Sequence, residues 1–285
     1  MLKKLFVFLE MIKFGHSVFA LPFALISMLV AAGGVPSFPV VFWILVAVVS
    51  ARTAAMAFNR IVDVPIDAKN PRTKNRALVT GELSMTTAWL SVVVSVVLFV
   101  MAAGMLNSLA LLLSVPTLMV LLGYSLMKRV TSLVHGVLGL ALGIAPIGAW
   151  IAVTGELALL PCILGLGVLF WVMGFDLLYA CQDYESDKRD PRVHSIPKRV
   201  GIRRAFALAR LSHLEAFLLF LLFWMFTPQL GGFFLLGLLG TGTLMLYQHS
   251  LLRPDDLSRI NQAFFTSNGI ISLLLFAMTC LDVLL

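Results

Sequence analysis

Long apolar stretches separated by shorter polar ones divide the chain from end to end. Nine of these stretches are close to the roughly 20 residues that a helix needs to cross a bilayer. They lie near residues 14–33, 38–58, 86–104, 109–127, 133–153, 158–180, 205–226, 231–252 and 264–284. None alternates like the short strands of a membrane barrel, and lipid offers unpaired backbone groups no partners. The pattern predicts an all-α polytopic membrane bundle of nine transmembrane helices, built as one domain over residues 1–285.

Positive charge lies on one side of this predicted bundle. The connections near residues 33–39, 104–108, 154–159 and 227–232 are short and contain no Lys or Arg. All 21 Lys and Arg residues lie in the N-terminal segment, in the connections near 59–85, 128–132, 181–204 and 253–263, or at the adjoining helix ends. The positive-inside rule makes that side cytoplasmic, so the N-terminus is predicted to be cytoplasmic and the C-terminus external.

Composition agrees with a membrane protein, since 60% of the residues are hydrophobic, 12% are charged and the mean hydropathy is +0.99. A soluble domain needs a larger polar surface than this. The net charge of +7 follows from the basic cytoplasmic side and from anion binding there, so no nucleic-acid partner is expected. The three cysteines are far apart in the sequence, and neither a disulfide framework nor a zinc site is predicted.

Two of the basic connections are long, and both contain carboxylates at helical spacing. The first connection and the helix before it contain Arg52, Asn59, Asp63 and Asp67. The second and its preceding helix contain Asp176, Tyr179, Asp183 and Asp187. The intervals from 176 to 183 to 187 repeat those from 52 to 59 to 63, and each loop continues with Pro-Arg after an Asn or Asp. This weak internal repeat predicts two similar half-sites that face each other.

Carboxylates in this arrangement suit magnesium, which prefers oxygen ligands and usually combines one or two carboxylates with waters and substrate phosphates. Two facing clusters can grip a polyanion through metal ions, while nearby Arg and Lys side chains neutralise its phosphate oxygens. The arrangement suits cleavage of an allylic carbon–oxygen bond, because negative charge develops on the leaving diphosphate.

Two further ionisable residues, Arg52 and Asp176, lie about two turns inside apolar segments. A charge at the centre of a span costs roughly 2.5–3.5 kcal/mol on insertion scales, and such residues usually face a cavity. We expect Arg52 and Asp176 either to face the site or to form a buried structural ion pair with each other.

At these residues the chain resembles the UbiA family of intramembrane aromatic prenyltransferases. The family's three polar motifs, N-x3-D-x3-D, R-T-x2-R and Y-x3-D-x3-D, match in turn Asn59, Asp63 and Asp67; Arg72, Thr73 and Arg76; and Tyr179, Asp183 and Asp187. Further family segments resemble Tyr124 with Lys128 and Arg129, Ala145-Pro146, and Ser195-Ile196-Pro197 with Gly201. The resemblance covers about residues 14–270.

The resemblance implies that four aspartates act as catalytic groups by holding two magnesium ions, namely Asp63, Asp67, Asp183 and Asp187. It implies substrate-binding roles for Arg52, Asn59, Arg72, Arg76, Lys128, Tyr179 and Lys198. The donor would be a polyprenyl diphosphate whose tail lies in an apolar tunnel open to the lipid bilayer. The acceptor would be an aromatic hydroxy acid used in quinone biosynthesis.

The identity of the acceptor stays open between two aromatic acids. The stretches 16–23 and 51–59 are similar to a bacterial subgroup linked to menaquinone made by the futalosine route, which favours a dihydroxynaphthoate over 4-hydroxybenzoate. Either Arg52 or His16 is expected to pair with the acceptor carboxylate. The resemblance implies a bacterial cytoplasmic (inner) membrane, with the active site facing the cytoplasm.

A multispan transporter of a small anion or metal ion is the alternative, because nine spans, an internal repeat and intramembrane charges would also suit one. The ionisable residues nevertheless gather at one face, whereas a transporter needs a pathway that reaches both.

Two residues depart from the family pattern. Arg60 stands where the family usually has an acidic residue. Pro65 lacks a helical donor and its ring clashes with the preceding turn, so we expect the helix to end there and Asp67 to lie on a loop. His135, His213 and His249 lack metal-ligand spacing, and packing roles are expected for them.

Overall fold

The computed structural model describes residues 2–13, 15 and 19–285. Within that part the regular structure is helical, apart from an isolated bridge between Arg253 and Asp256. The elements are α1 (Leu2–Met11), α2 (Leu21–Ala32), α3 (Phe38–Asp67), α4 (Ala77–Thr80), α5 (Met85–Leu106), α6 (Ser108–Met127), α7 (Val134–Thr154), α8 (Leu159–Ala180), η2 (Cys181–Asp183), α9 (Tyr184–Arg189), α10 (Ile196–Val200), α11 (Ile202–Met225), α12 (Gly232–Ser250), η3 (Gln262–Ser267) and α13 (Asn268–Leu284). The prediction of an all-α protein is confirmed.

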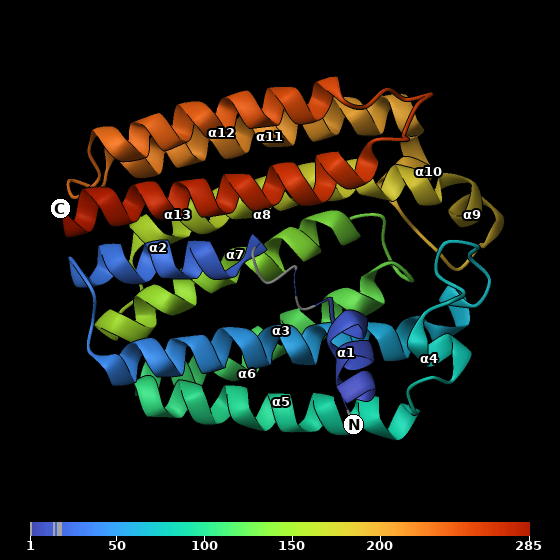
Figure 1. Ribbon diagram of the computed structural model, residues 1–285, viewed down its shortest axis with the longest axis horizontal. Coiled ribbons are helices and arrows are strands. Elements are labelled where there is room, and N and C mark those ends of the chain that lie inside the picture. The colour runs from blue at the N-terminus through green and yellow to red at the C-terminus, as the bar shows by residue number, and fades with distance from the viewer. Residues whose placement is uncertain (1, 14, 16–18) are drawn as a thin grey trace.

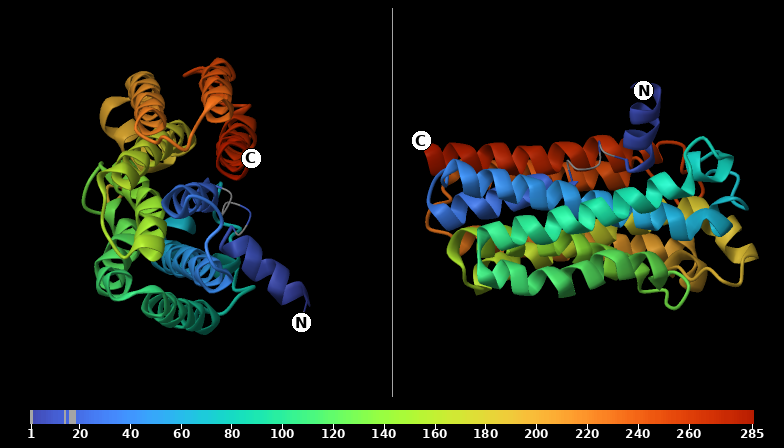
Figure 2. Two further views of the ribbon diagram at one scale, coloured as in Figure 1. Left: turned by 90° about the vertical axis from the view of Figure 1, so that its left-hand side faces the viewer. Right: turned by 90° about the horizontal axis from the view of Figure 1, so that it is seen from below.

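The long helices run side by side along one axis, with α4, α9 and α10 at one end of the bundle and the C-terminus at the other (Figure 1). Seen along that axis the helices form a curved wall, in which α13 packs against α2 and α2 packs against α7 (Figure 2). The short helix α1 stands at a steep angle to the bundle axis (Figure 2). The first and last parts of the chain are thereby brought together.

Seven helical segments of the described chain are long and apolar enough to cross a membrane: α3, α5, α6, α7, α8 with α9, α11, and η3 with α13. The protein is therefore an integral membrane protein. The other two predicted spans also form helices, α2 and α12, but neither is among the seven. The 12 residues of α2 give about 18 Å of helix against a hydrocarbon core of about 30 Å, and part of the predicted segment 14–33 lies outside the described residues.

Two segments are much longer than a bilayer crossing requires, and both end at the same end of the bundle. Helix α3 has 30 residues, and the segment from α8 to the end of α9 has 31. About 20 residues cross the hydrocarbon core. The last third of each segment therefore extends beyond the core, and those last turns contain the paired aspartates.

The expected helix break at Pro65 does not occur. Helix α3 continues through Pro65 and includes Asp67 as its last residue, so the prediction that Asp67 lies on a loop was wrong. A proline ring displaces the carbonyls of the preceding turn and removes one of their donors. Arg129 supplies a donor from outside the helix, because its Nη2 binds the carbonyl oxygen of Val62. Asp67 thereby stays on the face that begins with Asn59 and Asp63.

Helices α7 and α8 approach each other closely because glycines face each other across their contact. A methyl group added at Gly143 would overlap the carbonyl oxygen of Gly165, and one added at Gly165 would lie 2.5 Å from the carbonyl oxygen of Gly143. Small residues allow such close packing between membrane helices. This contact fixes the position of α8 and hence of the second aspartate pair.

We predict that Gly143→Ala destabilises the protein in detergent by about 1–3 kcal/mol, the usual cost of overpacking a well-packed contact. The matched control is Gly148→Ala on the same helix, because a methyl group there meets no atom within 4 Å. Thermal unfolding followed by tryptophan fluorescence compares the two variants. Equal unfolding temperatures for both variants would contradict the role given to the Gly143–Gly165 contact.

Candidate active site

A polar cavity of about 790 Å³ lies where α3 and α8 end. Ten of the eleven side chains expected to act on substrate or metal line it: Arg52, Asn59, Asp63, Asp67, Arg72, Arg76, Lys128, Tyr179, Asp183 and Asp187. The two motifs, more than a hundred residues apart in sequence, thus face one space. The turn that follows each motif also has the same local form, since the backbone N–H of Arg72 donates to Asn70 Oδ1 (2.9 Å) and that of Arg192 donates to Asp190 Oδ1 (3.0 Å).

The first half-site is built on the last turns of α3. Asp63 is buried, and its Oδ2 accepts from Asn59 Nδ2 (3.1 Å) one turn earlier and lies 2.6 Å from Lys128 Nζ at the end of α6. Asp67 Oδ2 lies 2.5 Å from Arg76 Nη1. Thr73 Oγ1 donates to the backbone carbonyl of Asp67 (3.1 Å), which holds the following loop against the helix end. Two carboxylates and two cations are therefore fixed on one wall.

The loop after α3 connects the two half-sites. Arg72 forms a bidentate pair with Asp183, with 2.9 Å from Nε to Oδ1 and 2.5 Å from Nη2 to Oδ2. Its Nη1 donates to the Tyr179 hydroxyl (3.1 Å), and its guanidinium lies over the Tyr179 ring. Asn70 Nδ2 also donates to Asp183 Oδ1 (2.8 Å). Burial would lower the pKa of Arg72, but its hydrogen bonds and attraction to Asp183 raise that pKa overall, so the guanidinium stays charged.

The second half-site differs from the first in its partners. Asp187 Oδ2 accepts from Ser195 Oγ (2.9 Å), and Arg192 folds back onto Asp190 in its own loop rather than crossing the cavity. Lys198 does not line the cavity. Its Nζ donates to the carbonyl oxygens of Asp190 (2.9 Å) and Val193 (2.6 Å), at a neighbouring hollow. The structure therefore places Lys198 behind the loop rather than in front of it.

The suggested buried ion pair between Arg52 and Asp176 is not formed. Arg52 Nη2 donates to the carbonyl oxygen of Lys13 (3.2 Å), while Asp176 Oδ2 lies 2.7 Å from His135 Nδ1. Arg52 and Asp176 both line the cavity, and Arg52 Nε is buried without a hydrogen-bond partner. The expectation that they face the site is therefore confirmed, and the ion-pair alternative was wrong. The residue suggested beside Arg52 for the acceptor, His16, lies outside the described residues.

Three groups of the site were not singled out from the sequence: Asn70, Arg129 and His135. Asn70 and Arg129 lie within recognised motifs, but their partners are distant in sequence. His135, for which only a packing role was expected, lines the cavity and contacts Asp176. The only feature of the sequence that indicates a place at the site is its position in the first turn of α7, soon after Lys128 and Arg129.

The carboxylates suit a metal ion whose coordination shell is completed by oxygen atoms of a substrate. Among the described residues, no three His, Cys, Asp or Glu side chains gather closely enough to hold a metal ion unaided. Magnesium typically takes only one or two carboxylates and completes its shell with phosphate oxygens and waters. Asp63 Oδ1 is buried without a hydrogen-bond partner, although Arg129 Nη2 lies 3.7 Å away, so one oxygen remains available as a ligand. The donor set fits magnesium bound together with a diphosphate.

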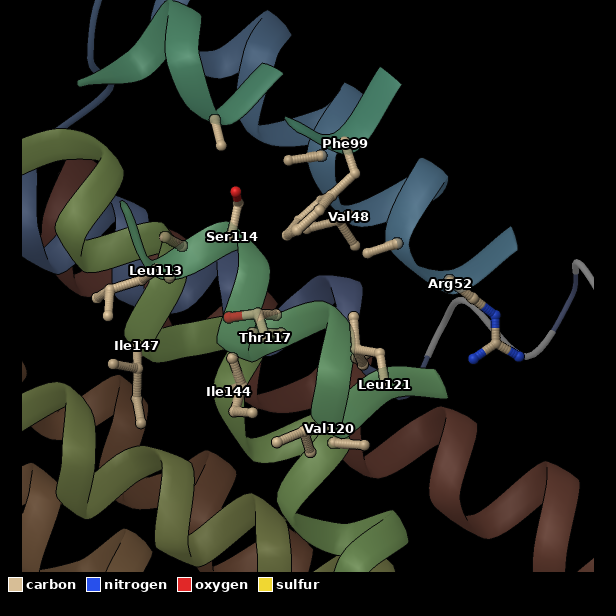
Figure 3. Close-up of a pocket in the computed structure, with 18 of the residues that line it drawn as sticks. Val48, Arg52, Phe99, Leu113, Ser114, Thr117, Val120, Leu121, Ile144 and Ile147 are labelled. Carbon is tan, nitrogen blue, oxygen red and sulfur yellow. The ribbon is translucent and has the colours of Figure 1, made fainter. Parts of the chain in front are cut away.

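An apolar chamber of about 350 Å³ lies next to the polar cavity, between α3, α5, α6 and α7. The two spaces share five lining residues: Arg52, Met56, Tyr124, Leu138 and Leu142. Figure 3 shows Arg52 at one side of the chamber, with Val48, Ser114, Thr117 and Leu121 along its walls. A ligand with a charged head and an apolar tail can therefore occupy both spaces at once.

Comparison with known proteins agrees with this geometry. Residues 20–270 match the model of the UbiA prenyltransferase family. Over 251 residues the chain is 30% identical to the 4-hydroxybenzoate octaprenyltransferase of Haemophilus ducreyi, covering 85% of this chain and 86% of that protein. An apo structure of a UbiA homolog from Aeropyrum pernix K1 superposes with a TM-score of 0.85 at 29% identity, over 94% of this chain and 98% of that one.

A more distant structure shares the fold alone. The UbiA homolog from Archaeoglobus fulgidus bound to DMAPP and Mg2+ has a TM-score of 0.69 at 20% identity, over 98% of this chain and 99% of that one. The family match extends over most of the chain and includes both aspartate motifs at one cavity. The chain therefore belongs to the UbiA prenyltransferase family and is a prenyltransferase.

Proposed function

We propose that the protein transfers a polyprenyl group from a polyprenyl diphosphate to an aromatic hydroxy acid, with magnesium bound by the two aspartate half-sites. The observation that supports this most directly is the junction of a charged cavity with an apolar chamber. A polyprenyl diphosphate is divided in the same way, because its charged head and its hydrocarbon tail meet at the carbon that reacts. That carbon would lie near the junction.

Magnesium would be held by Asp63 and Asp67 on one side and by Asp183 and Asp187 on the other, with Asn59 assisting. When bound, it supplies Lewis-acid stabilisation of the charge that develops on the diphosphate. Arg72, Arg76 and Lys128 stand beside these carboxylates, each within 2.6 Å of one of them. They would donate to phosphate oxygens, and Tyr179 would keep the Arg72 guanidinium oriented.

The acceptor would lie beside the junction, with its carboxylate on Arg52. Arg52 is half-buried in α3, has a buried Nε without a hydrogen-bond partner and lines both the cavity and the chamber. The name of the Haemophilus ducreyi relative supports 4-hydroxybenzoate as the acceptor, while the resemblance of residues 16–23 and 51–59 to the menaquinone-linked subgroup supports a dihydroxynaphthoate. Both are aromatic hydroxy acids, so the type of reaction is the same.

We further propose nine crossings within one domain over residues 1–285, with the N-terminus and the cavity on the cytoplasmic side of a bacterial inner membrane. The segregation of all 21 Lys and Arg residues supports this orientation. The two helices not counted among the seven spans, α2 and α12, lie between or beside counted helices in the bundle (Figure 1).

Membranes containing the protein should prenylate the acceptor only when magnesium is present. Asp63→Ala and Asp187→Ala should each lower the rate at least about 100-fold, because each removes a carboxylate that would hold the magnesium stabilising the leaving diphosphate. The matched control is Asp255→Ala, in an exposed connection outside the cavity, which should retain wild-type activity. Near-normal rates in the Asp63 or Asp187 variant would exclude the metal roles. Parallel assays with 4-hydroxybenzoate and a dihydroxynaphthoate identify the acceptor.

Narrowing the chamber should discriminate between donors of different length. Ser114→Phe fills part of the chamber, so activity with a long polyprenyl diphosphate should fall while activity with geranyl diphosphate persists. Leu112→Phe on the same helix is the control, because that side chain is 70% exposed on the outer surface of the bundle. If the Ser114 variant uses both donors as the wild type does, the tail lies elsewhere.

The orientation can be tested with a reporter at the C-terminus. Nine crossings from a cytoplasmic N-terminus place the C-terminus outside, so a fused alkaline phosphatase should be active and a fused fluorescent protein dark. A cytoplasmic C-terminus would contradict the nine-span topology but would leave the chemistry of the site untouched.

A further inference from the structure

Asp176 differs from the other aspartates of the cavity in its depth and in its partner. It lies seven residues before Asp183 on α8, as Arg52 lies seven residues before Asn59 on α3. Asp63, Asp67 and Asp183 each pair with a Lys or Arg side chain. Among the ion pairs of the described residues, Asp176 contacts a histidine instead, with 2.7 Å between its Oδ2 and His135 Nδ1. Asp176 therefore lies deeper along its helix than Asp183, as Arg52 lies deeper than Asn59, and it is not paired with the cations proposed to bind the diphosphate.

The surroundings of His135 determine which ring nitrogen carries hydrogen. The backbone N–H of Ile196 donates to His135 Nε2 (3.4 Å), so that nitrogen acts as an acceptor. The hydrogen is then on Nδ1 and is donated to Asp176 Oδ2. The His135 side chain is 4% exposed, whereas that of Asp176 is 21% exposed and lines the cavity. His135 is thus a buried support for Asp176, whose partly exposed carboxylate lines the cavity.

The reaction proposed above requires a proton acceptor at about this depth. The allylic C–O bond breaks with its electron pair leaving on the diphosphate, and a ring carbon beside the acceptor hydroxyl forms a C–C bond to the allylic carbon. The product keeps its hydroxyl group, so the hydrogen lost overall is the one on the attacked ring carbon. That C–H bond breaks, its electron pair restores the aromatic ring, and the proton passes to a base.

Resting on that proposed function, we propose that Asp176 is the base that takes the ring proton, and that His135 is the positioning residue that holds its carboxylate. The Asp176 carboxylate becomes a carboxylic acid and returns the proton to solvent when the products leave the cavity. Cavity carboxylates paired with Arg72, Arg76 or Lys128 are committed to the diphosphate end. Asp176 lies at the depth of Arg52, where the acceptor carboxylate would be held, and so is close to the acceptor ring.

The test is a kinetic isotope effect in the purified full-length protein, with polyprenyl diphosphate, magnesium and the acceptor that the wild type prenylates. The acceptor is used unlabelled and deuterated at the ring carbons beside its hydroxyl. With the base in place proton loss is fast, so the wild-type isotope effect should be near unity. Asp176→Asn should lower kcat about 100-fold, a usual contribution of general base catalysis. It should also produce a normal primary isotope effect, while KM for the polyprenyl diphosphate stays close to that of the wild type.

Variants of His135 separate positioning from folding. His135→Ala should lower kcat by about 10-fold or more and raise the isotope effect, and His135→Gln, which keeps a donor toward Asp176, should restore part of both. If the Asp176→Asn protein does not accumulate, the two His135 variants test the proposal in its place. Asp255→Asn is the control, since Asp255 is an exposed carboxylate outside the cavity and its loss should change neither quantity.

A lower kcat with the isotope effect still at unity in the Asp176 and His135 variants would overturn the inference, as would an unchanged kcat. If either of these results were obtained while the wild-type protein prenylated one of the acceptors, the inference would fail but the proposed function would stand. Failure of the wild-type protein to prenylate any aromatic acid would instead remove the proposed function, and the inference with it.

Discussion

The helices have to cross a hydrocarbon core of about 30 Å, in which unpaired charges are costly, and this constraint explains the position of the site. Helix α3 and the segment from α8 to α9 contain 30 and 31 residues, about one half more than the roughly 20 that a crossing needs. Both begin at the end of the bundle that contains no Lys or Arg. Their surplus turns therefore emerge together at the opposite end, and the aspartates on those turns face one cavity.

The carboxylates at these helix ends are balanced by partners from neighbouring segments. Each half-site brings carboxylates out of the core, where an unpaired charge would be costly, and each pairs with a cation or a hydroxyl from a neighbouring segment. A magnesium diphosphate contains both signs of charge. Under the function proposed above, it would replace both members of these pairs at once, giving metal ions to the carboxylates and phosphate oxygens to Arg72, Arg76 and Lys128. Binding would then exchange one balanced set of charges for another, without leaving a buried charge unpaired.

Sequence spacing was sufficient for some local parts of the site. The intervals place Asn59 and Asp63 on one helix face, although Asp67 was expected on a loop. The repeated Pro-Arg after Asn or Asp predicts two similar half-sites, and the two loops do adopt the same turn. Contacts between the two loops could not be predicted from spacing, because Arg72 and its partner Asp183 are 111 residues apart. The same limit applies to His135 and Asp176, which are brought together by the close packing of α7 and α8.

Two expectations failed for reasons that depend on tertiary contacts. Pro65 does not end α3, and Arg129 from another segment binds the carbonyl of Val62 in the turn before the proline. Lys198 is turned away from the cavity by two backbone carbonyls of its own loop. A helical wheel or a motif match contains neither contact. Both residues were judged from local chemistry, whereas their positions are decided by neighbours that only the folded chain supplies.

The central claim is that the two aspartate half-sites bind metal ions together with a prenyl diphosphate. Manganese in place of magnesium allows this to be measured directly by electron paramagnetic resonance, using the purified protein and a non-reactive prenyl thiodiphosphate. Two manganese ions should bind per chain, and only with the diphosphate present. Asp63→Asn and Asp187→Asn should each weaken this binding. Manganese binding that does not depend on the diphosphate, or that is unchanged in both variants, would contradict the claim.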